Sequence, residues 1–292
     1  MRTFRRYAER LFLAIPVDPP LRSRRGLLLA WYVTVVCLAV IASTTGVRAA
    51  DFTTVDTKTL QAIELEAGRA LEQHPQLLAA LGGDYGDPAL TAYVTAVAER
   101  LLATSSFQRL GYRFRFVITD APDVFALSTA GGNVYLSRGM LALANNEAEL
   151  AAVLSHEIAH TVLRHGAERE QLVRSVRGRA NQAIAERALA ARHELAADDF
   201  SLYLMAEAGY DPRAQGRFLA AVARLTDIHA EIGVAGRGEL AAGHLNVDAR
   251  LAQVTASAER FAPRHGLWFE GTDVFLGAVE GMVYGRRPAD GM

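Results

Sequence analysis

The stretch VLSHEIAHTVLRH, residues 153–165, constrains this chain more than any other feature. It sets three histidines and a glutamate among aliphatic residues, and two kinds of structure can accommodate that mixture. One is a buried helix whose polar side chains are satisfied by their neighbours, and the other is half of a metal site. In the second, His156 and His160 share one face of a helix and can chelate a single Zn²⁺.

The other polar residues of this stretch have different predicted roles. Glu157 lies one position after the first histidine, beside the predicted metal, where a carboxylate can act as general base towards a water molecule. His165 lies nine residues after His156, which is half a turn away on a continuous helix. We therefore exclude His165 as a ligand and expect it at the surface, near the end of the helix.

A second segment, RHELAADDFSLYLMAEAGYDP (192–212), can supply a third ligand. It is predicted to be a helix ended by Gly209, with Glu194 and Asp198 on its inner face. Glu194 would complete a His₂Glu set with an open fourth position, as in catalytic zinc sites. Asp198 could accept the N–H of a ligating imidazole and fix its tautomer. The alternative is that both acids are solvated, against which the apolar residues after Asp198 argue. His193 would point about 100° away from Glu194 and is expected to be a structural or surface residue.

The remaining pattern predicts a mostly helical α+β domain with a small sheet. The segment YRFRFVITD alternates like a strand, and FAL and NVYLS predict a hairpin-like second strand pair. From Arg138 onward the pattern is helical almost to the end. The expected elements are helices at about 58–73 and 88–103, and strands within 112–120, 125–127 and 133–137.

Composition narrows the chemistry and the partners. The one cysteine, Cys37, lies in an apolar run near the N-terminus, so disulfides and cysteine nucleophiles are excluded from the rest of the chain. The net charge of −1, without a run of basic residues in the body, argues against nucleic-acid binding.

The first 49 residues resemble an export signal. Eight arginines accompany an uncharged run, 26–47, that precedes a small-residue cleavage pattern before Ala50. Residues 23–28, SRRGLL, resemble a twin-arginine signal, and the apolar run is also long enough to remain as an inner-membrane anchor. We therefore expect a periplasmic or envelope protein, with a leader at 1–49, a catalytic domain at 50–250 and a helical extension at 251–292.

The blocks HEIAHTVLRHGAERE and ELAADDFSLYLMAEAGYDP together resemble the zinc endopeptidase family of the CAAX prenyl proteases and HtpX, especially its bacterial periplasmic BepA-like branch. The segment FALSTAGGNVYLSRGMLALANNEAELAAVLSHE is similar to the family's strand-turn-strand and the helix that follows it. The resemblance implies a gluzincin-like fold that binds one Zn²⁺ per chain. It implies His156, His160 and Glu194 as ligands, Glu157 as general base, and Asp198 as a support of the ligands.

The same resemblance implies further contacts. Asn133, Val134 and Tyr135 would form an edge strand that pairs with an extended substrate. His244 would stabilise the oxyanion or cover the metal, and Arg250, six residues later, would contact substrate. The implied substrates are unfolded or misassembled envelope proteins. Two other functions stay open: a non-hydrolytic assembly factor or chaperone with the same fold, and an aminopeptidase or other zinc hydrolase.

Overall fold

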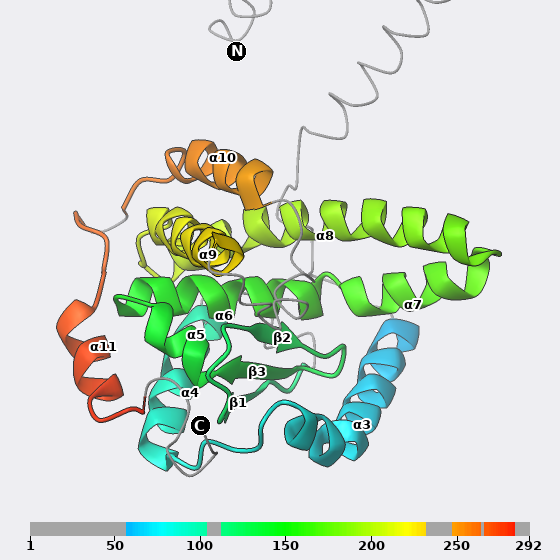
Figure 1. Cartoon of the computed structure of the whole chain (residues 1–292), viewed down its shortest axis with the longest axis horizontal. Coiled ribbons are helices and arrows are strands. Elements are labelled where there is room, and N and C mark those ends of the chain that lie inside the picture. The colour runs from blue at the N-terminus through cyan, green and yellow to red at the C-terminus, as the bar shows by residue number, and fades with distance from the viewer. Residues whose placement is uncertain (1–56, 104–111, 232–246, 264–265, 284–292) are drawn as a thin grey trace, which may run out of the picture. The chain divides into compact units, whose positions relative to one another are not determined.

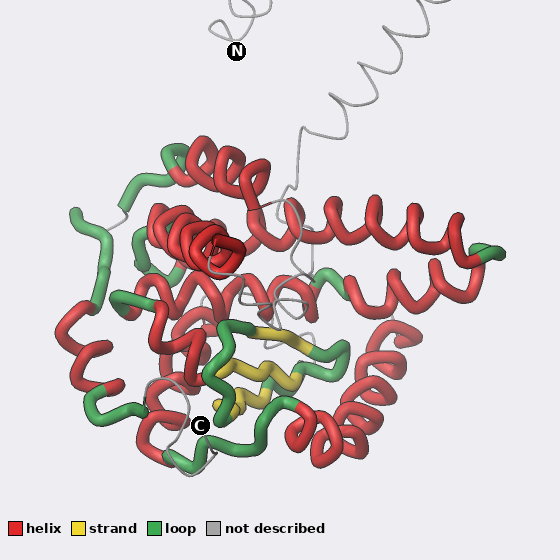
Figure 2. The backbone as a smooth tube through the Cα atoms, in the orientation of Figure 1, coloured by secondary structure: helices red, strands yellow, loops and turns green. Residues whose placement is uncertain are grey.

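The computed structural model describes residues 57–103, 112–231, 247–263 and 266–283, and Figure 1 shows their arrangement. Helices dominate this part of the chain, and three short strands form its sheet (Figure 2). The predicted class, a mostly helical α+β domain with a small sheet, is confirmed.

The first two helices are α3, Thr57–Ala80, and α4, Pro88–Ala103. Helix α4 begins at residue 88, as predicted, and the side chain of Asp87 just before it accepts a hydrogen bond from the N–H of Leu90 at 2.9 Å. Helix α3 continues past Pro75, beyond its predicted end near residue 73. Apolar residues at the end of this segment pack on the sheet, and that burial supports the longer helix.

The sheet comprises β1, Arg115–Thr119, β2, Ala126–Ser128, and β3, Asn133–Ser137. Their order is β1-β3-β2, with β1 parallel and β2 antiparallel to β3. All five residues of β3 are buried, as expected for the central strand of a covered sheet. The chain passes directly into α5, Arg138–Leu143, whose first turn is capped by Ser137.

Helix α6, Glu147–Val162, lies at the centre of the molecule, with the sheet on one side and α8 on the other (Figure 1). Nearly every side chain of α6 is buried, so this helix has no polar face turned towards solvent. The helix begins with a side-chain cap, since the Asn146 side chain accepts a hydrogen bond from the N–H of Glu149 at 2.9 Å. Small residues let α8 approach closely, and the Ser155 and Ser201 hydroxyls lie 2.5 Å apart between the two helices.

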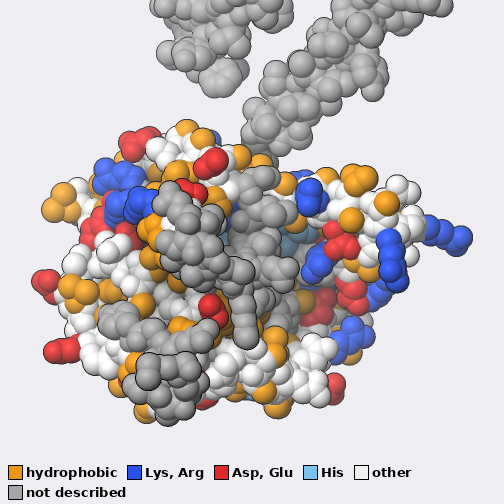
Figure 3. Space-filling model, viewed as in Figure 1, with side chains coloured by type: hydrophobic (Ala, Val, Ile, Leu, Met, Phe, Trp, Pro, Cys, Tyr) orange, Lys and Arg blue, Asp and Glu red, His pale blue; other side chains and the backbone are white. Residues whose placement is uncertain are grey.

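Helices α7, His165–Ser175, and α8, Arg179–Glu207, form a hairpin that extends beyond the sheet (Figure 1). The distal part of this hairpin is exposed, whereas the second half of α8 is buried against α6. Lys and Arg side chains gather over the exposed part (Figure 3), in agreement with the arginine-rich link of the sequence. Helix α7 and the turn that follows it therefore connect α6, which carries the two predicted histidine ligands, to α8, which carries Glu194.

The remaining helices cover the other end of α8 and α6: α9, Arg213–Glu231, α10, Val247–Ala258, and α11, Thr272–Val279. Helix α10 crosses residue 250, where we expect a domain boundary, and the division into domains stays a prediction. The leader, residues 1–49, lies outside the described residues. Within the described ranges, every helix is too short or too polar to cross a bilayer.

Candidate metal centre

Helices α6 and α8 bring the three predicted ligands together. His156 and His160 project from α6 with their Nε2 atoms 3.0 Å apart. The carboxylate of Glu194, on α8, faces both rings, with its oxygens 3.3 Å from His156 Nε2 and 3.3 Å from His160 Nε2. One donor atom from each of these residues lies within 4.8 Å of the others. The arrangement offers two nitrogens and a carboxylate around one point.

This donor set fits a divalent cation. The three side chains are 9%, 16% and 4% exposed, so water cannot readily solvate the carboxylate or the nitrogens that face it. Burial and the charge of Arg250 oppose a proton on His156, yet hydrogen bonds with Asp198 and Glu194 raise its pKa to about 9. Burial lowers the pKa of His160. A neutral His160 can offer a nitrogen lone pair, and two imidazoles with one carboxylate suit Zn²⁺.

Asp198 lies behind His156, and its role as a support of the ligands stays a prediction. Its Oδ1 is 3.0 Å from His156 Nδ1, on the side of the ring away from Glu194. Burial opposes the charge of this carboxylate, but hydrogen bonds from Arg250 and His156 lower its pKa to about 2. An ionised acceptor at Nδ1 keeps a proton on that nitrogen, so Nε2 is the atom of His156 through which a metal would bind.

Arg250 has a different place from the one that the sequence predicts. It is expected at the substrate, but it is 4% exposed and is not among the residues that line the cavity. Its Nε and Nη2 donate to the two oxygens of Asp198 at 2.7 and 2.8 Å, and its Nη1 lies 3.0 Å from Glu194 Oε2. Two buried carboxylates require a cation nearby, and this requirement explains why the guanidinium turns inward.

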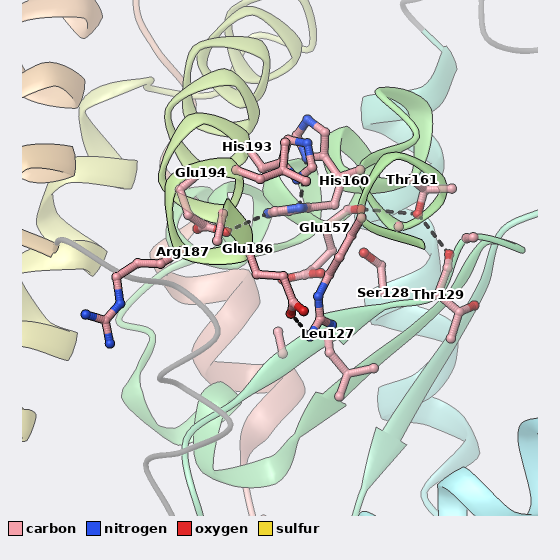
Figure 4. Close-up of a pocket in the computed structure, with 17 residues that line it drawn as sticks. Leu127, Ser128, Thr129, Glu157, His160, Thr161, Glu186, Arg187, His193 and Glu194 are labelled. Atoms are coloured by element: carbon pink, nitrogen blue, oxygen red, sulfur yellow. Dashed lines mark hydrogen bonds and ion pairs between the residues drawn. The ribbon is translucent and has the colours of Figure 1, made fainter. Parts of the chain in front are cut away.

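A cavity of about 440 Å³ opens in front of the centre (Figure 4). Glu157, His160 and Glu194 face it from the helices, and Leu127, Ser128 and Thr129 face it from β2 and the following residue. Glu157, the predicted general base, is 2% exposed and lies at this boundary between the ligands and the cavity. A substrate in the cavity would therefore contact both the general base and the metal centre.

The predicted substrate strand is wrong. Asn133, Val134 and Tyr135 belong to β3, which is the central strand of the sheet and is buried. Their polar atoms are used internally: Asn133 Nδ2 donates to Ala70 O at 3.1 Å, and the Tyr135 hydroxyl lies 2.7 Å from His74 Nδ1. The edge strand that faces the cavity is β2, which the sequence pattern identifies as a strand but not as the edge.

His165 is also placed differently from the prediction, and His193 lies beside it. Both are buried, at 6% and 7% exposure, and both line the cavity. Helix α6 ends at Val162, and Arg164, with a φ of 59°, breaks the helical spacing, so that His165 lies beside His160. Burial, with His160 and His193 nearby, lowers the pKa of His165 to about 3. The prediction failed because it assumed one continuous helix from His156 to His165.

His244 lies outside the described residues, so its predicted role stays a prediction.

The comparisons with known proteins agree with this geometry. Residues 88–177 match the model of peptidase family M48. The chain contains a peptidase family M48 domain. The matched range of the M48 domain includes His156, Glu157 and His160. The resemblance to this zinc peptidase family is confirmed.

Named relatives of the M48 domain are metalloendopeptidases and assembly-enhancing proteases. The mitochondrial metalloendopeptidase OMA1 of Schizosaccharomyces pombe is 32% identical over 154 residues, which are 45% of each chain. A beta-barrel assembly-enhancing protease of Yersinia pestis is 40% identical over 79 residues, 27% of this chain and 16% of the relative. A putative beta-barrel assembly-enhancing protease of Vibrio cholerae is 32% identical over 164 residues, 47% of this chain and 34% of the relative. This chain spans less than half of the length of each of these relatives.

Proposed function

We propose that this chain is a zinc-dependent endopeptidase that cleaves unfolded or misassembled proteins of the bacterial cell envelope. One observation carries the proposal: two imidazole nitrogens and a carboxylate converge beside Glu157, at a cavity bordered by β2, an edge strand of the sheet in the described part of the chain. The M48 domain and the names of its relatives support the peptidase activity.

In the proposed reaction, His156, His160 and Glu194 would hold the metal, which when bound would supply Lewis-acid polarisation of the scissile carbonyl. Glu157 accepts the proton of the attacking water and passes it to the leaving amine. Asp198 and Arg250 keep His156 and Glu194 oriented through the contacts described above. His244, if it reaches the centre, would stabilise the developing oxyanion or cover the metal.

We propose β2 as the strand to which an extended substrate adds. Phe125 O and Thr129 N bond to the β3 side, at 3.0 and 2.9 Å. Because bonded residues alternate along an antiparallel pair, the backbone groups of Ala126 and Ser128 point away from β3, towards the outer side of β2. Backbone pairing there would accept many sequences, and it requires the substrate segment to be unfolded.

The proposed location rests on the leader pattern of residues 1–49, which predicts export or anchoring at the inner membrane. In that compartment the substrates would be envelope proteins that have failed to fold or assemble. The names of the assembly-enhancing relatives support this class of substrate.

The proposal is tested by Glu157→Gln in the full chain, assayed with a labelled unfolded protein such as reduced and alkylated α-lactalbumin. We expect cleavage to be abolished while one zinc per chain remains bound, because the amide cannot accept the proton. Glu170→Gln, on the exposed face of α7, is the matched control and should cleave normally. Cleavage at the wild-type rate by Glu157→Gln would exclude this mechanism.

The same variant separates an enzyme from a non-hydrolytic assembly factor. A scaffold carrying Glu157→Gln should restore envelope assembly in cells that lack the protein, whereas an inactive enzyme should not. Cleavage inside peptides with blocked N-termini would separate an endopeptidase from an aminopeptidase.

A further inference from the structure

We propose that His165 is a positioning residue of the metal centre, whose Nδ1 accepts the Nδ1–H of His160 and so holds that ligand in its metal-binding tautomer. The inference rests on the proposed metal site and adds to it a residue outside the ligand set. Its evidence is the contact between the two rings and the packing that keeps His165 in place.

The two Nδ1 atoms, of His160 and His165, lie 3.0 Å apart. A neutral imidazole that binds a metal through Nε2 must carry its proton on Nδ1. That N–H needs an acceptor because His160 is largely buried. His165 Nδ1 is within hydrogen-bonding distance and can accept it when His165 is neutral, with its own proton on Nε2. The two rings meet edge to face, with their centroids 4.8 Å apart and their planes at 82°.

His193 holds the ring of His165 from the other side. The two rings are stacked, with centroids 4.0 Å apart and planes within 7°. His193 is itself fixed through its Nε2, which lies 2.8 Å from Glu168 Oε2. Because α8 supplies His193 and α7 supplies Glu168, the hairpin fixes the orientation of His165 from both of its helices.

The backbone also directs His165 towards the centre. The preceding residue, Arg164, has a φ of 59°, a left-handed conformation that is unfavourable for residues other than glycine. Its guanidinium is tied to α3, where Nη2 lies 2.6 Å from Glu66 Oε1. Residues with side chains rarely adopt this conformation without compensation, and here it places an imidazole beside a predicted ligand.

The two histidine ligands thus have different supports. His156 faces the ionised carboxylate of Asp198, whereas His160 faces a neutral ring. Removing such a partner from a zinc ligand typically weakens metal binding by about 10–100-fold. We expect an effect of that size from loss of the acceptor at His165.

Two substitutions separate the acceptor from the stacked ring. His165→Asn keeps an acceptor near the position of Nδ1 but removes the ring, whereas His165→Phe keeps a ring against His193 but removes the acceptor. The matched control is His74→Phe, which changes a histidine bonded to Tyr135 at the other side of the sheet. For each full-length variant, the zinc dissociation constant is measured by chelator competition at one pH, and the metal-free form is checked by thermal unfolding.

We expect His165→Phe to weaken zinc binding by about 10–100-fold, with His165→Asn and His74→Phe remaining within a few-fold of wild type. In metal-free protein, ¹⁵N spectra of the histidine rings should show that His165→Phe alone loses the Nδ1–H tautomer of His160. If His165→Phe folds and binds zinc as tightly as wild type, or if His165→Asn is as weak as His165→Phe, the positioning role is wrong. If the wild type binds no zinc, both the proposed metallopeptidase function and the positioning role of His165 are wrong.

Discussion

Arg250 and Asp198 form a two-pronged ion pair in the protein interior, with Nε–Oδ2 and Nη2–Oδ1 distances of 2.7 and 2.8 Å. Both side chains are at most 5% exposed, so neither charge is solvated. The pair links α10 to α8, and through Asp198 it reaches His156. Its integrity therefore affects both the stability of the fold and the metal centre.

Arg250→Met should destabilise the protein by about 3–5 kcal/mol, because two buried carboxylates lose their cation. The measurement is the free energy of unfolding from urea titration of the metal-free form. Arg260→Met is the control: Arg260 is 69% exposed and lies 3.8 Å from Asp199, so its loss should change stability by about 0.5 kcal/mol or less. Equal effects of the two substitutions would contradict the placement of Arg250.

Glu194→Ala should remove zinc from the protein, because two imidazoles alone leave the centre without its carboxylate ligand. We expect one zinc per wild-type chain and far less than one in the variant, measured by elemental analysis of protein purified without added metal. Glu170→Ala, on the neighbouring exposed surface, should retain the full zinc content. Zinc retained in Glu194→Ala would assign the third ligand elsewhere.

Ser128→Pro should weaken cleavage of extended substrates without unfolding the sheet. Proline at position 128 removes the outward N–H of that residue but none of the hydrogen bonds from β2 to β3. Proline is tolerated on edge strands of this kind. Loss of one backbone hydrogen bond of about 1 kcal/mol predicts a decrease of about fivefold in kcat/KM. Ser128→Ala retains the N–H and should cleave like the wild type; a similar decrease in both variants would argue against strand addition.

Asp211 should make the stability of the fold sensitive to acid. Burial opposes its charge, but hydrogen bonds from Arg213, with Arg217 nearby, lower its pKa to about 2 from an unfolded value near 3.8. Since the folded pKa is the lower one, the carboxylate stabilises the fold above about pH 4, and this contribution disappears as the pH falls towards 2.

The measurement compares wild type with Asp211→Asn, both free of metal, by urea unfolding at several pH values. The wild type should be more stable by about 1–2 kcal/mol near neutral pH, and the difference should shrink between about pH 5 and 2. Asp273→Asn, in the exposed first turn of α11, is the control and should show a smaller dependence. A difference in unfolding free energy between the two proteins that stays constant with pH would contradict the stabilising role of the ionised Asp211 beside Arg213.

Local patterns in the sequence predicted the features that depend on helical spacing. The pairing of His156 with His160, and the common face of Glu194 and Asp198, follow from residues four apart on a helix. The start of α4 follows from an Asp-Pro cap. These features need only a few neighbouring residues, and the structure places them as the pattern indicates.

Features that depend on long-range packing were not predictable in the same way. Strands β2 and β3 were both identified, but their order depends on β1 pairing with β3 from elsewhere in the chain. His165 was misplaced because one left-handed residue, Arg164, ends the helical spacing and has no glycine to mark it. Arg250 was assigned by motif alone, whereas its position is determined by buried carboxylates on another helix.

The hairpin of α7 and α8 joins His160 to Glu194, so a bound ion would fasten its two ends at the base. Such a cross-link would restrict the conformations that the hairpin segment can adopt when it unfolds. It would thereby reduce the conformational entropy of the unfolded chain, as a disulfide does in a secreted protein. The body of this chain has no cysteine with which to form one. Metal loading would then govern how often the hairpin opens, and with it the susceptibility of the arginine-rich segment to proteolysis.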